Sequence, residues 1–233
     1  MKYVIGNWKS NLNITETKNW IKTVKKSLSE NSENLKIILC PGYTHLPIFK
    51  SDLKDLALGA QTISSFPDGA YTGQVSARTL KDYIEYVIVG HSERRTYLKE
   101  TDNTINNQVT QAIESSITPI IAVDKKNWHS QLSIINSQQL SQSLVMYEPP
   151  EAISQQVGPV GKGSAAPIKE VVEMIKKIKS EFSFKASIYG GSIKSDNIKE
   201  FLSQEEIDGV LPGSASINPD EWVKMITIAA KIS

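Results

Sequence analysis

The side chains best suited to chemistry each come directly after a short apolar run of the sequence. They are Lys9, His91 and Glu148. An ammonium group binds anions, an imidazole acts near neutral pH as acid, base or hydrogen-bond donor, and burial makes a carboxylate a stronger base. Arranged around one small anion, these three groups suit the abstraction of a proton beside a carbonyl. Such a reaction requires no metal or other cofactor.

Each of these residues, taken alone, also has a structural explanation. Lys9 could be a solvated lysine, His91 a structural histidine and Glu148 a salt-bridged glutamate at a strand end. Of the 3 histidines, however, His91 alone follows a strongly apolar run and precedes charged residues. Ser92 and Glu93 are placed to begin a helix, whose dipole would favour the neutral imidazole. Asn7 is placed to orient Lys9.

Two turns of small residues follow the last two apolar runs. One contains Gly190, Gly191 and Ser192, and the other contains Pro212, Gly213 and Ser214. Small residues let backbone N–H groups approach a ligand, and paired turns of this kind form the phosphate site of many barrels. Either turn alone is common, but together they predict a phosphate-binding cradle.

The apolar runs themselves predict eight β-strands. They span Tyr3–Gly6, Lys36–Cys40, Leu56–Ala60, Tyr86–Gly90, Pro119–Val123, Leu144–Tyr147, Ala186–Tyr189 and Gly209–Leu211. Most are continuously apolar, which is typical of parallel strands buried on both faces. Helix-length amphipathic stretches accompany them, notably Thr15 to Leu28, Ile168 to Phe182 and about Glu221 to Ala230, the last behind the start signals Asn218 and Pro219. Such alternation predicts an α/β fold with right-handed crossovers.

The length of the chain, 233 residues, favours one barrel domain. Eight strands leave about thirty residues for each strand–helix unit, as in a (β/α)8 barrel. We therefore expect a single domain over residues 1–233, with an open doubly wound sheet as the alternative. Lys125 to Ser143 shows the weakest helical pattern of the units, because it is polar and has few apolar anchors.

The charge and cysteine content exclude several classes of protein. With 26 basic and 25 acidic residues the net charge is +1, which indicates neither a nucleic-acid nor a membrane-surface partner. The apolar runs are too short to span a bilayer. The single cysteine, Cys40, cannot form an internal disulfide. We expect a soluble protein of a reducing compartment, the cytoplasm.

Six motifs, in order and at compatible spacing, resemble those of the triosephosphate isomerases over essentially the whole chain. They are Gly6-Asn7-Trp8-Lys9-Ser10-Asn11, Gly69-Ala70-Tyr71-Thr72-Gly73-Gln74, Val89-Gly90-His91-Ser92-Glu93-Arg94-Arg95, Tyr147-Glu148-Pro149, Tyr189-Gly190-Gly191-Ser192 and Asp208-Gly209-Val210-Leu211. The resemblance implies a TIM barrel that interconverts D-glyceraldehyde 3-phosphate and dihydroxyacetone phosphate without a cofactor.

The resemblance also implies a role for each candidate residue. Glu148 would shuttle the proton and His91 would polarise the carbonyl as a neutral imidazole, a pairing for which this family is the standard example. Lys9 would supply positive charge and Asn7 a polar contact. Glu93 would be a supporting carboxylate, with Ser92 beside it. The phosphate contacts would come from Ser192, Gly213, Ser214 and the lid residues Ile153 and Ser154.

The lid, Pro149 to Gly163, is where the sequence departs most from the family. Ser154-Gln155-Gln156 stands where Gly-Thr-Gly is usual, and Pro149-Pro150-Glu151 replaces the common Pro-Val-Trp hinge. The loss of two glycines removes permissive backbone positions and affects the expected closure of the lid. Two smaller departures are Ala122-Val123-Asp124-Lys125 for Cys-Ile-Gly-Glu and Pro212-Gly213-Ser214 for Val-Gly-Gly.

The resemblance implies a homo-oligomer, in which the loop carrying Thr72 inserts beside Lys9 and His91 of a neighbouring copy. A dimer is the first expectation and a tetramer the alternative. Two other functions are also compatible with a phosphate-binding barrel: a sugar-phosphate epimerase or indole-glycerol-phosphate-type enzyme, and a barrel that binds but does not catalyse.

Overall fold

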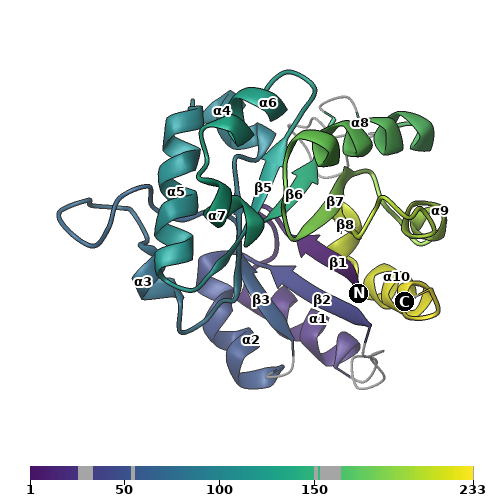
Figure 1. Cartoon of the computed structure of the whole chain (residues 1–233). Helices are drawn as coiled ribbons and strands as arrows, with labels where there is room; N and C mark the ends of the chain where they lie inside the picture. The colour runs from purple at the N-terminus through teal and green to yellow at the C-terminus, as the bar shows by residue number, and fades with distance from the viewer. Residues whose placement is uncertain (26–33, 54–55, 150–151, 153–163, 233) are drawn as a thin grey trace.

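Eight parallel strands close into a barrel in the computed structural model, which describes residues 1–25, 34–53, 56–149, 152 and 164–232 (Figure 1). The strands are β1 (Lys2–Asn7), β2 (Leu35–Cys40), β3 (Ala57–Ala60), β4 (Tyr86–Val89), β5 (Thr118–Val123), β6 (Leu144–Tyr147), β7 (Ala186–Gly191) and β8 (Gly209–Pro212). Each pairs with its sequence neighbours, and β8 returns to β1. The (β/α)8 prediction is thus confirmed and the open sheet is wrong.

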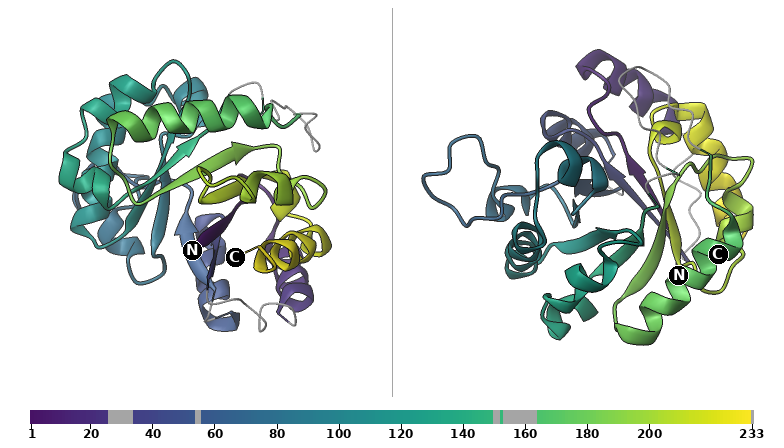
Figure 2. Two further views of the ribbon diagram at one scale, coloured as in Figure 1. Left: turned by 45° about the vertical axis from the view of Figure 1, so that its right-hand side comes forward. Right: turned by 90° about the horizontal axis from the view of Figure 1, so that it is seen from above.

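Helices surround this barrel on its outer side (Figure 2). The α-helices are α1 (Ile14–Val24), α2 (Leu46–Asp52), α3 (Ala77–Leu80), α4 (Ser92–Tyr97), α5 (Asp102–Glu114), α6 (Trp128–Ser133), α7 (Ser137–Ser141), α8 (Ile168–Glu181), α9 (Ile198–Leu202) and α10 (Pro219–Ala230). Two 3-10 turns, η2 (Tyr43–His45) and η4 (Ser214–Ser216), complete the described part.

Three predicted helices match these elements closely, with differences at their ends. The helix expected over Ile168 to Phe182 is α8, which ends one residue earlier, at Glu181. The helix expected over Thr15 to Leu28 is α1, and positions 26–28 lie outside the described residues. The last helix begins at Pro219, two residues earlier than expected, because Asn218 caps it by accepting from the Asp220 and Glu221 amides. The polar stretch from Lys125 to Ser143 forms two short helices, α6 and α7.

Alternate residues of each strand belong to two separate apolar layers. In β4, Ile88 joins a cluster that draws residues from all eight strands and fills the barrel interior, whereas Val87 and Val89 belong to a second cluster shared with the helices. All three are fully buried. This two-sided burial explains why the strands read as continuous apolar runs.

Three of the 4 tryptophans pack together beneath the end of β1. Trp8 meets Trp20 edge-on at 5.1 Å between ring centroids, and Trp20 lies 6.4 Å from Trp222. The indole N–H groups of Trp8 and Trp20 both donate to the Ser216 carbonyl, at 3.2 and 3.1 Å. The cluster therefore ties the segment after β1 to η4, which follows β8.

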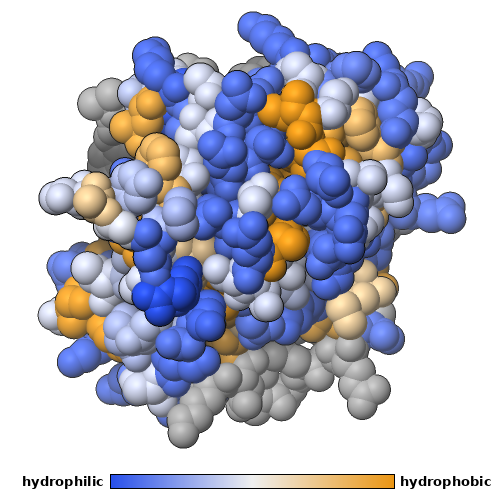
Figure 3. Space-filling view, turned by 60° about the vertical axis from the view of Figure 1, so that its left-hand side comes forward, coloured by the Kyte–Doolittle hydropathy of each residue, from blue (hydrophilic) through white to orange (hydrophobic). Residues whose placement is uncertain are grey.

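Figure 3 shows one face of the molecule, on which hydrophilic residues predominate and apolar residues form separated patches. None of the helices described is both long and apolar enough to cross a membrane.

Candidate active site

His91 stands at the junction of β4 and α4. Gly90, immediately after the strand, adopts a left-handed φ of 74°, and His91 then serves as the N-cap of α4. The predicted helix start at Ser92 is thus confirmed. The Glu93 amide donates to His91 Nδ1 at 3.2 Å, so the neutral ring carries its hydrogen on Nε2. The geometry presents Nε2–H as a hydrogen-bond donor.

Glu148 follows β6 and is 5% exposed. Its Oε1 lies 2.9 Å from His91 Nε2, and its Oε2 accepts a hydrogen bond from the Ser92 amide at 3.1 Å. The backbone is held by the Glu148 amide, which donates to the Val123 carbonyl at 2.8 Å. Both carboxylate oxygens are therefore engaged, one with the imidazole and one with the first amide of α4.

Burial shifts the pKa of His91 and of Glu148 in one direction, and the contact between the two side chains shifts each pKa in the other. Burial lowers the pKa of His91, but the adjacent Glu148 carboxylate raises it, and with Glu148 in place the raising effect dominates. Burial raises the pKa of Glu148, whereas His91 and the Ser92 amide lower it, with a net decrease. When the carboxylate moves off the ring, burial and the Glu93 amide both favour neutral imidazole.

Lys9 lies beyond β1 in a constrained backbone conformation. Its φ of 51° is in the left-handed region, which is unusual for a side chain other than glycine. Asn7 Oδ1 accepts from the Lys9 amide at 3.0 Å, and Gln61 Nε2 donates to the Lys9 carbonyl at 2.8 Å. Such constrained backbone persists where neighbouring groups hold it in place. Asn7 and Gln61 thus both hold the backbone of Lys9 in this conformation.

Glu93 links the lysine to the histidine. Its Oε1 lies 2.5 Å from Lys9 Nζ, and its Oε2 lies 3.7 Å from His91 Nδ1. Through this carboxylate the ends of β1 and β4 are joined at one rim of the barrel. Lys9 also acts electrostatically on both His91 and Glu148. The structure therefore gathers the three residues that were predicted from separate strand ends.

The two small-residue turns lie at the same rim. A Cβ added to Gly213 would come within 3.5 Å of Lys9 Cε, so the turn after β8 adjoins the lysine. Ser214 begins η4, directly after Gly213. The Ser192 hydroxyl, after β7, donates to the Ala152 carbonyl at 2.9 Å. Ser192 thus contacts a residue of the segment identified as a lid.

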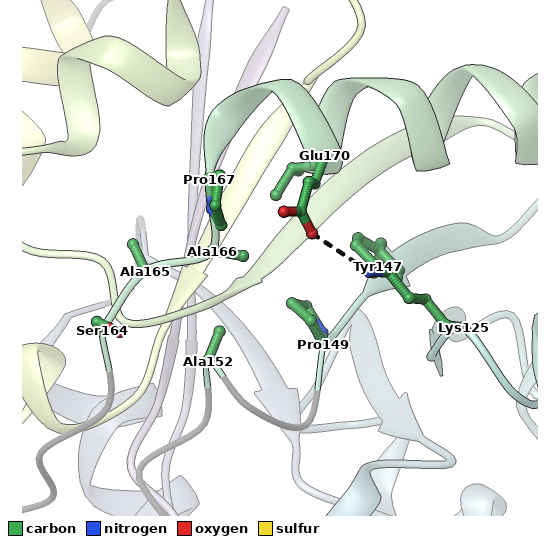
Figure 4. A pocket seen from close by; sticks show the side chains of 10 residues that line it. Lys125, Tyr147, Pro149, Ala152, Ser164, Ala165, Ala166, Pro167 and Glu170 are labelled. Carbon is green, nitrogen blue, oxygen red and sulfur yellow. Dashed lines mark hydrogen bonds and ion pairs between the residues drawn. The ribbon is translucent and has the colours of Figure 1, made fainter.

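A pocket of about 120 Å³ lies between β6 and the start of α8 (Figure 4). Lys125 and Glu170 form an ion pair of 3.3 Å across it, over Tyr147 and Pro149. Ala166, which also lines the pocket, donates from its amide to the Tyr189 hydroxyl at 2.9 Å. The pocket is lined by Pro149 and Ala152, which belong to the predicted lid segment, and by Ser164, which directly follows it.

Of the remaining predicted site residues, two fall outside the described part of the chain and one lies on a projecting loop. Ile153 and Ser154 are outside the described residues, together with most of the lid. Thr72 is exposed, on the loop between β3 and α3 that projects from the barrel (Figures 1 and 2). Gln61 went unnoticed in the sequence because its role depends on contacts with Lys9 and Cys40. Its position at a strand end was the only local signal.

Comparison with known proteins gives a consistent result over the full length. The family model described as triosephosphate isomerase matches residues 2–229. A triosephosphate isomerase of Dictyoglomus turgidum is 37% identical over 246 residues, covering 95% of this chain and 96% of that protein. One from Mesomycoplasma hyopneumoniae is 36% identical over 244 residues, covering 97% and 98%. One from Dictyoglomus thermophilum is 37% identical over 250 residues, covering 97% and 98%.

Proposed function

The chain belongs to the triosephosphate isomerase family, and from this premise we propose how its residues interconvert D-glyceraldehyde 3-phosphate and dihydroxyacetone phosphate. It is an isomerase. Glu148 removes a proton from the carbon beside the substrate carbonyl, giving an enediolate, and returns the proton to the neighbouring carbon. The observation that carries this proposal is the contact of 2.9 Å between the buried Glu148 carboxylate and His91 Nε2.

His91 acts on the substrate oxygens as a neutral donor. The Glu93 amide occupies Nδ1, which leaves Nε2–H free to donate to the carbonyl or enediolate once Glu148 has moved. A donor aimed at developing negative charge lowers the barrier most in a site that excludes water. His91 and Ser92 must release Glu148 for this purpose, since both carboxylate oxygens are engaged in the structure described.

Lys9 supplies the positive charge for the anionic substrate and transition state. Asn7 orients Lys9 through its backbone amide, and Glu93 holds the ammonium group in place. The backbone at Ser192, Gly213 and Ser214 forms the phosphate cradle. The nearness of Gly213 to Lys9 supports this assignment, because one anion then meets both groups.

The lid, Pro149 to Gly163, closes over the intermediate, with Ile153 and Ser154 contributing phosphate contacts. Closure excludes water and prevents loss of phosphate from the enediolate. The contact of Ser192 with Ala152 is consistent with a lid that is anchored to the phosphate cradle at its first turn.

We further infer that the chain folds as one domain over residues 1–233 and acts in the cytoplasm as a homodimer, with a tetramer as the alternative. The loop with Thr72 would insert beside Lys9 and His91 of a second copy. Phe66 and Tyr71 on this loop are 45% and 40% exposed, and their rings stack at 4.5 Å. An exposed apolar tip of this kind supports burial against another chain.

The test is a coupled assay with both triose phosphates. Glu148→Gln preserves the shape of the side chain but cannot accept the proton, so kcat falls on the order of a thousandfold. Binding of glycerol 3-phosphate, which lacks the carbonyl, is largely retained. Glu170→Gln, which alters a carboxylate in the pocket beside the lid, serves as a control for charge loss. An unsubstituted chain that converts neither triose phosphate would disprove the proposal.

The altered lid has its own test. Replacing Ser154→Gly, Gln155→Thr and Gln156→Gly together restores the usual lid sequence of the family. We expect the ratio of isomerisation to phosphate elimination to rise, because the added glycines widen the backbone conformations open to the closed lid. An unchanged ratio would mean that the departure is neutral for this chemistry.

A further inference from the structure

We propose that Arg95 is a positioning residue for His91 and acts through the carbonyl of Gly90. The inference rests on the role proposed for His91 in isomerisation. Arg95 lies in α4, the helix that His91 caps, and its side chain is 16% exposed. Its Nε donates to the Gly90 carbonyl at 3.0 Å. That carbonyl belongs to the peptide unit that joins Gly90 to His91.

The Arg95 guanidinium is anchored on two other helices at the same time. Its Nη1 donates to Asp102 Oδ1 in α5, and its Nη2 donates to Gln131 Oε1 in α6, both at 2.6 Å. Gln131 is fully buried, and the Ser130 hydroxyl donates to the other Asp102 oxygen at 2.8 Å. The position of the Nε–H group is thus determined by α5 and α6.

The peptide that receives this hydrogen bond has little freedom. A Cβ on Gly90 would lie 3.1 Å from the Ala122 carbonyl oxygen, 3.2 Å from Ile105 Cδ1 and 3.4 Å from Arg95 Nη2. The left-handed φ of Gly90 turns the chain from β4 into α4, and the orientation of its peptide sets the direction of the His91 side chain. Arg95 holds this peptide by its hydrogen bond, while the backbone of β5 and a side chain of α5 lie close to Gly90.

For His91, the consequence is the direction in which its Nε2–H group points. The ring is oriented by the Glu93 amide at Nδ1, and that amide belongs to the same first turn of α4. Rotation of the peptide between Gly90 and His91 would move the ring relative to both Glu93 and Glu148. Displacements on the order of 1 Å can lower a rate about a hundredfold, so the clamp affects turnover more than substrate binding.

Arginine is required because three acceptors must be met in one plane. A lysine carries the same charge but presents a point donor, which can satisfy Asp102 while leaving the buried Gly90 carbonyl and Gln131 Oε1 without this donor. Arg95→Lys therefore keeps the ion pair with Asp102 but removes the hydrogen bond to the Gly90 carbonyl. Asp102→Asn does the converse, since it removes the charge but keeps an Oδ1 that can accept from Arg95 Nη1, which leaves Arg95 Nε in place.

The experiment compares these two variants by steady-state kinetics and by 15N NMR of the His91 ring. We expect Arg95→Lys to lower kcat on the order of tenfold or more with KM within about twofold, and to change the His91 Nδ1 and Nε2 signals. Asp102→Asn should keep kcat within about threefold and leave these signals unchanged. Thermal unfolding of both variants shows that each is folded at the assay temperature.

Three results would overturn the inference. They are an unchanged kcat in Arg95→Lys, a lower kcat without any change in the His91 signals, and an equal loss with equal spectral change in Asp102→Asn. The last would assign the effect to the packing of α4 on α5. Because the NMR readout needs no substrate, a chain without isomerase activity would disprove the proposed function and still allow the positioning of His91 to be tested.

Discussion

The left-handed turn at Gly90 allows a quantitative prediction for Gly90→Ala. An alanine at a φ of 74° costs about 1–2 kcal/mol relative to glycine. Its Cβ would also press on the Ala122 carbonyl at 3.1 Å and on Ile105 Cδ1 at 3.2 Å. The first of these is backbone in β5 and cannot rotate away, so overpacking adds about 1–3 kcal/mol. We expect Gly90→Ala to lower the free energy of unfolding by about 2–5 kcal/mol, the sum of the two.

Gly73→Ala is the matched control for this variant. Gly73 also has a positive φ, 86°, but a Cβ added there would meet no atom of the described residues within 4 Å. The conformational cost and the effect on the unfolded chain are therefore shared, and the difference between the variants isolates the contacts. Urea denaturation at one protein concentration, with sedimentation to verify an unchanged oligomer, measures this difference. Equal destabilisation by the two substitutions would refute the reasoning.

The remaining predictions concern titration and reactivity. Glu148→Gln removes the carboxylate that raises the pKa of His91, so an NMR titration should show that pKa fall; a rise would contradict the electrostatic account. Because folding lowers the pKa of Glu148, its carboxylate stabilises the fold above about pH 4.3, the ordinary pKa of a glutamate. Because folding raises the pKa of His91, its protonated ring stabilises the fold below about pH 6.5, the ordinary pKa of a histidine. The stability advantage over Glu148→Gln should therefore peak between these two pH values and shrink on either side. Cys40 is fully buried and burial raises its thiol pKa, so a thiol reagent should modify it only as fast as the protein unfolds, and rapid labelling of folded protein would be inconsistent with the structure.

Much of the barrel was predictable because each strand carries its own signal. Residues such as Val87, Ile88 and Val89 are apolar on both faces, and the structure buries one face in the barrel and the other under helices. The start of α10 also had a local signal, since Asn218 and Pro219 mark it in the sequence and Asn218 caps the helix. The stretch from Lys125 to Ser143 has little apolar periodicity, and its split into α6 and α7 depends on packing against the rest of the barrel.

The proposed site was predictable where a residue type suited to chemistry directly follows a strand. His91 and Glu148 were identified in this way, and the structure brings them into contact. Gln61 and Arg95 were not singled out, because their roles depend on backbone carbonyls, of Lys9 and Gly90, that only the folded chain brings near them. An amide or guanidinium that supports another residue leaves no pattern in the sequence.

The tryptophan cluster also gives the protein an optical reporter at its site. Trp8 lies between Asn7 and Lys9, is fully buried, and shares the Ser216 carbonyl with Trp20. Emission from this cluster therefore comes from beside the residues proposed to hold the substrate phosphate, while Trp128 lies apart on α6. An anion drawn to Lys9 and η4 changes the electric field at two coupled indoles, so the intrinsic fluorescence of the chain can follow occupancy of the site without any added label.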